Sequence, residues 1–108
     1  MRQPGLHRGS VWIAELTEPI GQRPVVVLTR DVAIPHLTNV TVALVTRTVR
    51  GIPSEVPLGP EEGLSYECVA SCDNIHTIPC RWMARRVGSL SPEKLHTLAR
   101  AIQIALDV

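Results

Sequence analysis

The sequence has no long apolar run and no segment that resembles an export signal. Its longest uninterrupted apolar stretch covers only residues 25–28, whereas a membrane-spanning helix needs about 20 such residues. Residues 1–10 are polar and lack the apolar core of a secretory signal. We therefore expect a protein without a membrane segment that stays in the cytoplasm.

The chain also lacks a Gly/Ser-rich or charge-rich linker and any large excess of charge. Its 108 residues fit the usual size of one domain, so we expect a single domain over residues 1–108. A formal net charge of only +1 argues against a protein that coats nucleic acid through overall basicity. Apolar residues make up 44% of the chain, which is enough for a buried core and argues against disorder.

Lysine is nearly absent. Lys94 is the only lysine among the 11 basic residues. Arginine binds phosphate through a planar fork of donors, so this bias suits phosphate recognition. A GC-rich genome produces the same bias by replacing lysine with arginine everywhere. The composition alone does not decide between these two explanations.

Cysteine is scarce and odd in number. Cys68, Cys72 and Cys80 stand in a chain without an export signal, so no disulfide framework is expected. Together with His76 they recur at every fourth residue, and all four are zinc-ligand types. That spacing converges only on a helix, which Pro79 and the β-branched neighbours disfavour. We expect buried free thiols and no metal.

Short β-branched segments separated by Gly and Pro turns predict a mostly β protein. The predicted strands cover residues 9–16, 25–29, 39–49, 54–58, 66–72 and 85–90, with a loop at 31–38 and a helical turn near 81–84. Ser91 is a favourable N-cap with Pro92 at the first helical position, and apolar residues then recur every three or four positions. We expect a strongly curved antiparallel sheet or partial barrel, with this helix covering an open side.

Familiar catalytic signatures are missing from the sequence. It contains no glycine-rich phosphate loop, no Gly-x-Ser-x-Gly elbow and no His-Glu-x-x-His helix. His36, His76 and His96 are scattered along the chain, and an isolated surface or core histidine is the expectation for each. His76 is the strongest candidate for a catalytic base, because a predicted tight loop surrounds it.

Arginine and threonine gather where two predicted strands begin and end. Arg23 opens the second strand, while Thr46, Arg47, Thr48 and Arg50 close the third. Adjacent antiparallel strands bring such ends together. Guanidinium groups and hydroxyls then grip phosphate oxygens and stabilise a charged transition state without a metal. The alternative is that this Arg/Thr alternation is only the solvent face of a strand.

Five blocks of sequence, in order and in register, resemble the MazF/PemK toxin family. They are RGSVWIAEL (residues 8–16), GQRPVVVLTRD (21–31), VALVTRTVRGIPSEVPL (42–58), CDNIHTIP (72–79) and RRVGSLSPEKL (85–95). The resemblance covers nearly the whole chain from Arg8 onward. Its most specific parts are the Arg-Pro-Val-Val-Val strand and the Val-Thr-x-Thr-x-Arg-Gly stretch.

The resemblance implies a mainly β fold with one helix, a small SH3-like (PemK/CcdB-type) antiparallel barrel. It also implies a sequence-specific endoribonuclease that cuts single-stranded RNA without metal or other cofactor. Arg23 and Thr46 match the family's active-site residues. The RNA's own 2′-hydroxyl would attack the adjacent phosphate and leave 2′,3′-cyclic phosphate and 5′-hydroxyl ends. The residues expected to contact RNA are Glu18, Gln22, Arg47, Thr48, Arg50 and His76.

By the same resemblance we expect a homodimer, silenced by an acidic cognate antitoxin whose disordered tail folds over the arginine-lined groove. No DNA or membrane partner is expected. One departure concerns the first loop, because residues 18–22 are a shortened version of a longer family loop. Glu18 either replaces an acid of that loop or is a plain turn residue. Trp12 is expected in the core. Trp82 is expected at a dimer edge or at an RNA-facing edge, and the sequence does not decide between these two places.

Two other functions remain open from the sequence. A non-catalytic toxin with the same barrel would bind a protein target such as a topoisomerase. A plain SH3-like interaction module would have neither activity. Cleavage of RNA in the presence of EDTA distinguishes both from the nuclease.

Overall fold

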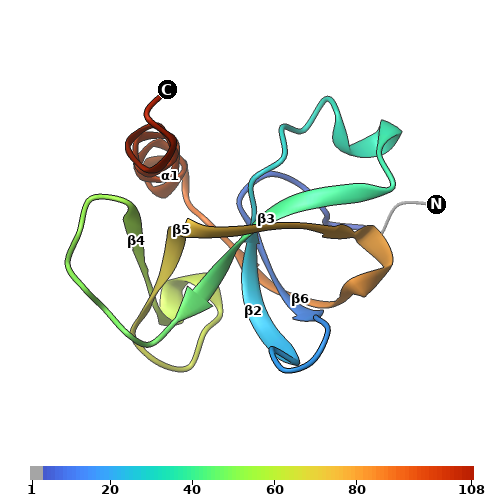
Figure 1. Ribbon diagram of the computed structural model, residues 1–108, viewed down its shortest axis with the longest axis horizontal. Coiled ribbons are helices and arrows are strands. Elements are labelled where there is room, and N and C mark those ends of the chain that lie inside the picture. Colours follow the sequence, from blue (N-terminus) through green and yellow to red (C-terminus); the bar gives the residue numbers. More distant parts are fainter. Residues whose placement is uncertain (1–3) are drawn as a thin grey trace.

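The computed structural model describes residues 4–108 as one six-stranded antiparallel sheet and a C-terminal helix (Figure 1). The strands are β1 (Ser10–Glu15), β2 (Gln22–Val27), β3 (Asn39–Thr46), β4 (Glu55–Leu58), β5 (Cys68–Pro79) and β6 (Met83–Ser89), and the helix is α1 (Pro92–Leu106). Three short 3-10 segments, η1 (Ile34–His36), η2 (Pro60–Glu62) and η3 (Cys80–Trp82), join them. The strand order is β4-β5-β3-β2-β1-β6. The expected curled antiparallel sheet with a terminal helix is confirmed.

The central strands are buried on both faces. In β2, Val26 contributes to a core that also holds Leu98 and Ala101 of α1. Val25 and Val27 point the other way, into a second core that includes Trp12. Because successive side chains of a strand alternate in direction, this continuous valine run fills both cores at once. The prediction that Trp12 lies in the core is confirmed, since it is 3% exposed.

Helix α1 begins where the capping signal predicts. The hydroxyl of Ser91 accepts a hydrogen bond from the backbone N–H of Lys94 at 3.2 Å, and Pro92 occupies the first turn. The ammonium of Lys94 lies 3.1 Å from the buried carboxylate of Glu62 in η2. This ion pair ties the start of α1 to the turn before β5, on the β4 and β5 side of the sheet where Figure 1 shows the helix.

The sheet curls until its two ends meet beside η2. Gly63 follows η2 with a φ of +88°, and its backbone lies against that of β6. A Cβ atom at Gly63 would lie 2.0 Å from the carbonyl oxygen of Val87, and one at Gly88 would lie 2.1 Å from that of Glu62. Close backbone approach at this point therefore closes the barrel, and it requires glycine on both sides.

The predicted limits of β3 and β5 need correction. Strand β3 ends at Thr46 rather than at residue 49, and β5 continues to Pro79 rather than ending at residue 72. The pairing of β3 with β5 jumps from Leu44 opposite Ser71 to Ala43 opposite Ile75. Residues 72–74 therefore form a bulge, and its polar residues resemble a loop in the sequence.

The three cysteines are buried free thiols, as predicted. Cys68 and Cys72 lie in the core shared with α1, whereas Cys80 lies in the second core. Burial is the largest cause that raises the pKa of Cys72, to about 11, with a smaller contribution from Asp73. Among residues 4–108, no helix is long and apolar enough to cross a membrane.

Candidate active site

A polar hollow of about 410 Å³ lies where the second core gives way to charged side chains. Strands β2, β3, β4 and β5 and the β3–β4 loop contribute to its wall. The residues that line it are Arg23, Thr46, Thr48, Arg50, Glu55, Ser71, Asp73 and Asn74. Four of these, Arg23, Thr46, Thr48 and Arg50, were predicted from the sequence.

Arg23 and Thr46 are brought together by strand register. The pairing of β2 with β3 ends at Val25 opposite Leu44, two residues from Arg23 on one strand and two from Thr46 on the other. Both side chains line the same hollow. The Nη2 atom of Arg23 also donates to the carbonyl oxygen of Val45 at 2.7 Å. The half-buried guanidinium is therefore fixed beside the end of β3.

The remaining donors at this position are free to meet a ligand. The hydroxyl oxygen of Thr46 accepts from the backbone N–H of Thr48 at 3.1 Å, so its own proton is available for donation. Arg23 uses one N–H of its fork on Val45, which leaves the others available. Within residues 4–108, neither Arg23 nor Arg50 forms an ion pair. Two unpaired guanidinium groups and a hydroxyl suit an anionic ligand such as a phosphodiester.

Glu55 organises the loop that carries Arg50. Its carboxylate oxygen Oε1 accepts from the backbone N–H groups of Arg50 at 3.0 Å and Gly51 at 3.1 Å. The side chain is buried, at 7% exposure. Because the carboxylate serves two backbone donors, it fixes the turn and leaves the Arg50 side chain at the rim of the hollow.

The bulge in β5 forms the opposite wall. Residues 72–74 have no partner on β3, and this places Asp73 and Asn74 against the hollow. Asp73 accepts a hydrogen bond from the hydroxyl of Ser54. The Asn74 carbonyl oxygen Oδ1 lies 3.2 Å from Nε2 of His76. The hollow is therefore lined by two guanidinium groups, of Arg23 and Arg50, and by two carboxylates, of Glu55 and Asp73, beside the amide of Asn74.

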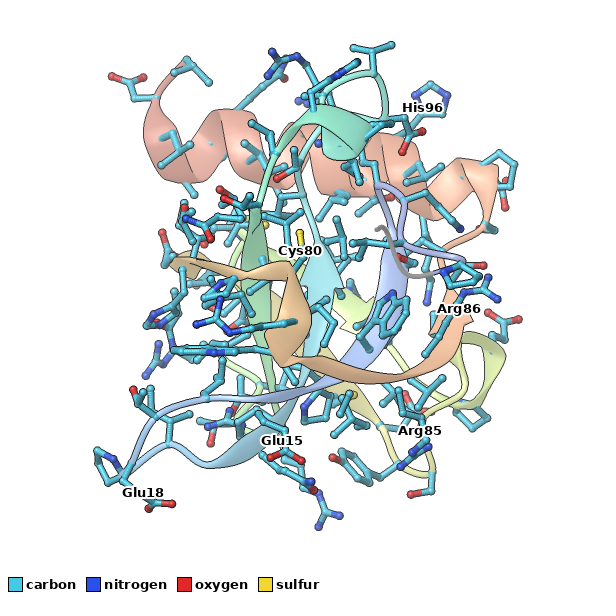
Figure 2. The ribbon with its side chains drawn as sticks, turned by 90° about the vertical axis from the view of Figure 1, so that its right-hand side faces the viewer. Glu15, Glu18, Cys80, Arg85, Arg86 and His96 are labelled. Atoms are coloured by element: carbon cyan, nitrogen blue, oxygen red, sulfur yellow. The ribbon has the colours of Figure 1, made fainter. Side chains whose placement is uncertain are left out.

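The remaining predicted RNA contacts lie outside this hollow. The guanidinium of Arg47 stacks on the ring of Tyr66, 3.7 Å from its centroid. Gln22 donates to Glu15 at 2.8 Å. Figure 2 shows Glu18 at the tip of the β1–β2 turn, at the end of the molecule opposite α1. His76 is half-buried and reaches the hollow only through its contact with Asn74.

Sequence reasoning missed Glu55, Ser71, Asp73 and Asn74. Asp73 and Asn74 were missed because β5 was expected to end at residue 72, so that the bulge was not foreseen. A signal for Glu55 does exist in the sequence, since an acid two residues after the Ile52–Pro53 turn is well placed to accept backbone N–H groups of that turn.

Other chemistry finds less support in the geometry. Cys72, whose pKa is raised by burial, lies outside the hollow, and a thiol without thiolate character is a poor nucleophile. A larger hollow of about 670 Å³ lies between α1 and the start of β3. Its wall is mainly apolar and contains neither Arg23 nor Thr46. We therefore place the chemistry in the smaller, polar hollow.

Comparison with known proteins agrees with this fold. The profile described as "PemK-like, MazF-like toxin of type II toxin-antitoxin system" matches residues 7–106. The chain is 50% identical over 86 residues to endoribonuclease MazF3 of Mycobacterium tuberculosis, covering 80% of this chain and 84% of MazF3. It is 38% identical over 101 residues to the probable endoribonuclease MazF5 of the same organism, covering 93% and 92% of the two chains.

Solved structures give the same result. The toxin MazF-mt6 of Mycobacterium tuberculosis matches with a TM-score of 0.85 and 46% identity, covering 92% of this chain and 97% of that one. A mycobacterial endoribonuclease in complex with its cognate antitoxin matches with a TM-score of 0.83 and 26% identity, covering 94% and 95%. The fold and the hollow define a small curled β-sheet protein with arginine and threonine side chains at one polar hollow. The chain belongs to the PemK-like, MazF-like toxins of type II toxin-antitoxin systems.

Proposed function

We propose that this chain is a sequence-specific, metal-independent toxin that cleaves single-stranded RNA at the hollow containing Arg23 and Thr46. As a family member with 50% identity to the endoribonuclease MazF3, it is an endoribonuclease. The observation that carries the assignment of the site is that Arg23 and Thr46 line one hollow, with no carboxylate in an ion pair with Arg23 or Arg50 among residues 4–108. The domain extends over residues 1–108.

In the proposed reaction, the 2′-oxygen of a ribose attacks the adjacent phosphorus, and the bond from phosphorus to the 5′-oxygen breaks. The 2′-hydroxyl loses its proton, and the departing 5′-oxygen gains one. The products are a 2′,3′-cyclic phosphate and a 5′-hydroxyl. Only RNA carries this nucleophile, which explains a preference for RNA over DNA.

Arg23 and Thr46 act on the charge that develops at phosphorus. The free N–H groups of Arg23 donate to the non-bridging oxygens, whose negative charge grows in the pentacoordinate state. The Thr46 hydroxyl donates a hydrogen bond to the same phosphate and holds this phosphate in position for the attack. A guanidinium is a poor base, so Arg23 acts as an electrostatic stabiliser.

Purified protein incubated with RNA in EDTA tests this proposal. We expect cleavage to continue at full rate, with ends that resist 5′-end ligation until they are phosphorylated, because the product carries a 5′-hydroxyl. A matched oligonucleotide with a single 2′-deoxy sugar at the cut position should stay intact. Activity abolished by EDTA and restored by Mg²⁺ contradicts the metal-independent mechanism. Failure to cut any RNA favours the alternative, a non-catalytic toxin that binds a protein target.

The proposed partner in the cytoplasm is a cognate antitoxin with an acidic segment that binds over Arg23 and Arg50. A mycobacterial relative has been solved with its cognate antitoxin. In this chain, the two unpaired guanidinium groups suit carboxylates as well as phosphate. An acidic tail bound there would exclude RNA from the hollow and so silence the toxin.

The proposed homodimer uses the larger, apolar hollow beside α1. Leu37 and Leu106 line this hollow and are 39% and 49% exposed. An exposed apolar hollow marks an interaction surface, and a twofold pair of copies is the commonest assembly that covers one.

Leu106→Asp is expected to convert the dimer to a monomer. Its carboxylate would have to be desolvated against the partner's apolar face, which costs several kcal/mol (about 2–7) without a hydrogen-bond partner. Light scattering coupled to size exclusion measures the mass. His96→Asp is the control, because His96 is exposed near the other end of α1 and does not line the hollow (Figure 2). A dimeric Leu106→Asp protein would show that the copies associate elsewhere.

A further inference from the structure

We propose that Asp73 and Asn74 read the nucleobase next to the scissile phosphate, which makes the β5 bulge a sequence-specificity element. This inference rests on the proposed function and deepens it. Both side chains line the same hollow as Arg23 and Thr46. A phosphate held by Arg23 therefore places its attached nucleotide within reach of this wall.

The bulge gives these two residues their position. On a regular strand, Asp73 and Asn74 would point to opposite faces of the sheet. Because residues 72–74 are extruded between the Ser71 and Ile75 pairings with β3, both side chains line one hollow. Bulges commonly redirect side chains next to active sites in this way.

Existing hydrogen bonds decide what each side chain still offers. Asp73 uses Oδ2 to accept from the Ser54 hydroxyl, so Oδ1 remains as an acceptor. Asn74 uses Oδ1 to accept from His76, because a carbonyl oxygen only accepts and Nε2 of His76 must then carry the proton. The amide NH₂ of Asn74 remains as a donor. The wall therefore presents one oriented acceptor beside one oriented donor.

This pattern suits a base edge better than a phosphate. A carboxylate repels a phosphate oxygen, whereas it accepts from the amino or imino groups of a base. Unpaired RNA bases are commonly recognised by hydrogen bonds to their Watson–Crick edges. The proposal thus assigns the guanidinium groups of Arg23 and Arg50 to the sugar-phosphate backbone and Asp73 and Asn74 to one base. The Glu55 carboxylate is held by backbone N–H groups.

Asn74→Leu tests this assignment because it removes the donor and keeps a similar size. The wild-type protein and the variant are given an RNA library with random bases, and the cut ends are sequenced. We expect the preference at one position beside the cut to flatten, with cleavage of the preferred sequence falling about 10- to 100-fold. Asn74→Asp should instead move that position toward guanine, whose N1–H and N2–H₂ groups offer two adjacent donors.

Thr97→Val is the control, because Thr97 is an exposed residue of α1 that lines neither this hollow nor the larger one. It should leave all base preferences unchanged. Unaltered preferences in both Asn74 variants, or an equal loss at every sequence, would overturn the inference. A wild-type protein that binds the library without cutting it overturns the proposed function instead, and selection by binding then tests Asn74 separately. RNA that is neither bound nor cut overturns both.

Discussion

Replacing Arg23 with alanine is expected to lower kcat for RNA cleavage by about 10²–10³-fold, the usual effect of removing one preorganised donor to a developing negative charge. The guanidinium of Arg23 donates a hydrogen bond to the Val45 carbonyl oxygen, and Arg23 lines the hollow. Its loss removes charge stabilisation that matters most in the transition state. KM should change less than kcat, which steady-state kinetics on a short RNA measures directly.

Arg23→Lys separates charge from geometry. The ammonium keeps the positive charge, but it cannot hold the Val45 carbonyl and a phosphate in the planar arrangement of a guanidinium. We expect most of the loss in kcat to remain. Recovery of wild-type activity by lysine would show that charge alone is needed, and that the fork plays no part.

Two variants of Thr46 test the role of its hydroxyl. Thr46→Ser retains it and should stay close to wild-type activity, whereas Thr46→Val keeps the shape and loses the proton that faces the hollow. Circular dichroism and thermal melting verify that each variant is folded. Equal activities of the serine and valine variants would remove Thr46 from the proposed mechanism.

The sequence predicted this pair from two sources. Arg23 begins a valine strand and Thr46 ends another, and antiparallel neighbours bring such ends together. Both residues also match active-site residues of the family that the sequence resembles. The start of α1 was predicted from local chemistry alone, because it depends on Ser91 and Pro92.

The other half of the hollow was not predictable in this way. Asp73 and Asn74 occupy it because β5 slips against β3, and a register shift depends on the partner strand rather than on the residues of the bulge alone. The burial of Glu55 likewise depends on a turn folding back over it. Arg47 shows the converse, since it neighbours Thr46 in sequence but stacks on Tyr66 instead of lining the hollow.

The contact between η2 and β6 leads to the largest expected effect on stability. Gly63→Ala introduces a Cβ 2.0 Å from the Val87 oxygen at a residue whose φ is +88°. The left-handed conformation costs an alanine about 1–2 kcal/mol, and the overpacked contact costs roughly 1–3 kcal/mol or more. Because the obstructing atoms are backbone, no side-chain rotation relieves the contact.

Two further glycine variants separate these two costs. Gly51→Ala has a φ of +70° but nothing within 4 Å, so it should show only the conformational cost. Gly88→Ala meets the Glu62 oxygen at 2.1 Å without a positive φ, so it should show only the contact cost. We expect the free energy of unfolding, from urea titration, to fall least for Gly51→Ala and most for Gly63→Ala.

The total expected loss for Gly63→Ala is about 2–5 kcal/mol, which is a large part of the roughly 5–15 kcal/mol that stabilises a typical domain. Its melting temperature should fall by roughly 8 °C or more. If Gly63→Ala and Gly51→Ala lose the same amount, η2 does not press on β6 and the barrel is open there. The series thus measures directly whether this curled sheet depends on two touching backbones for its closure.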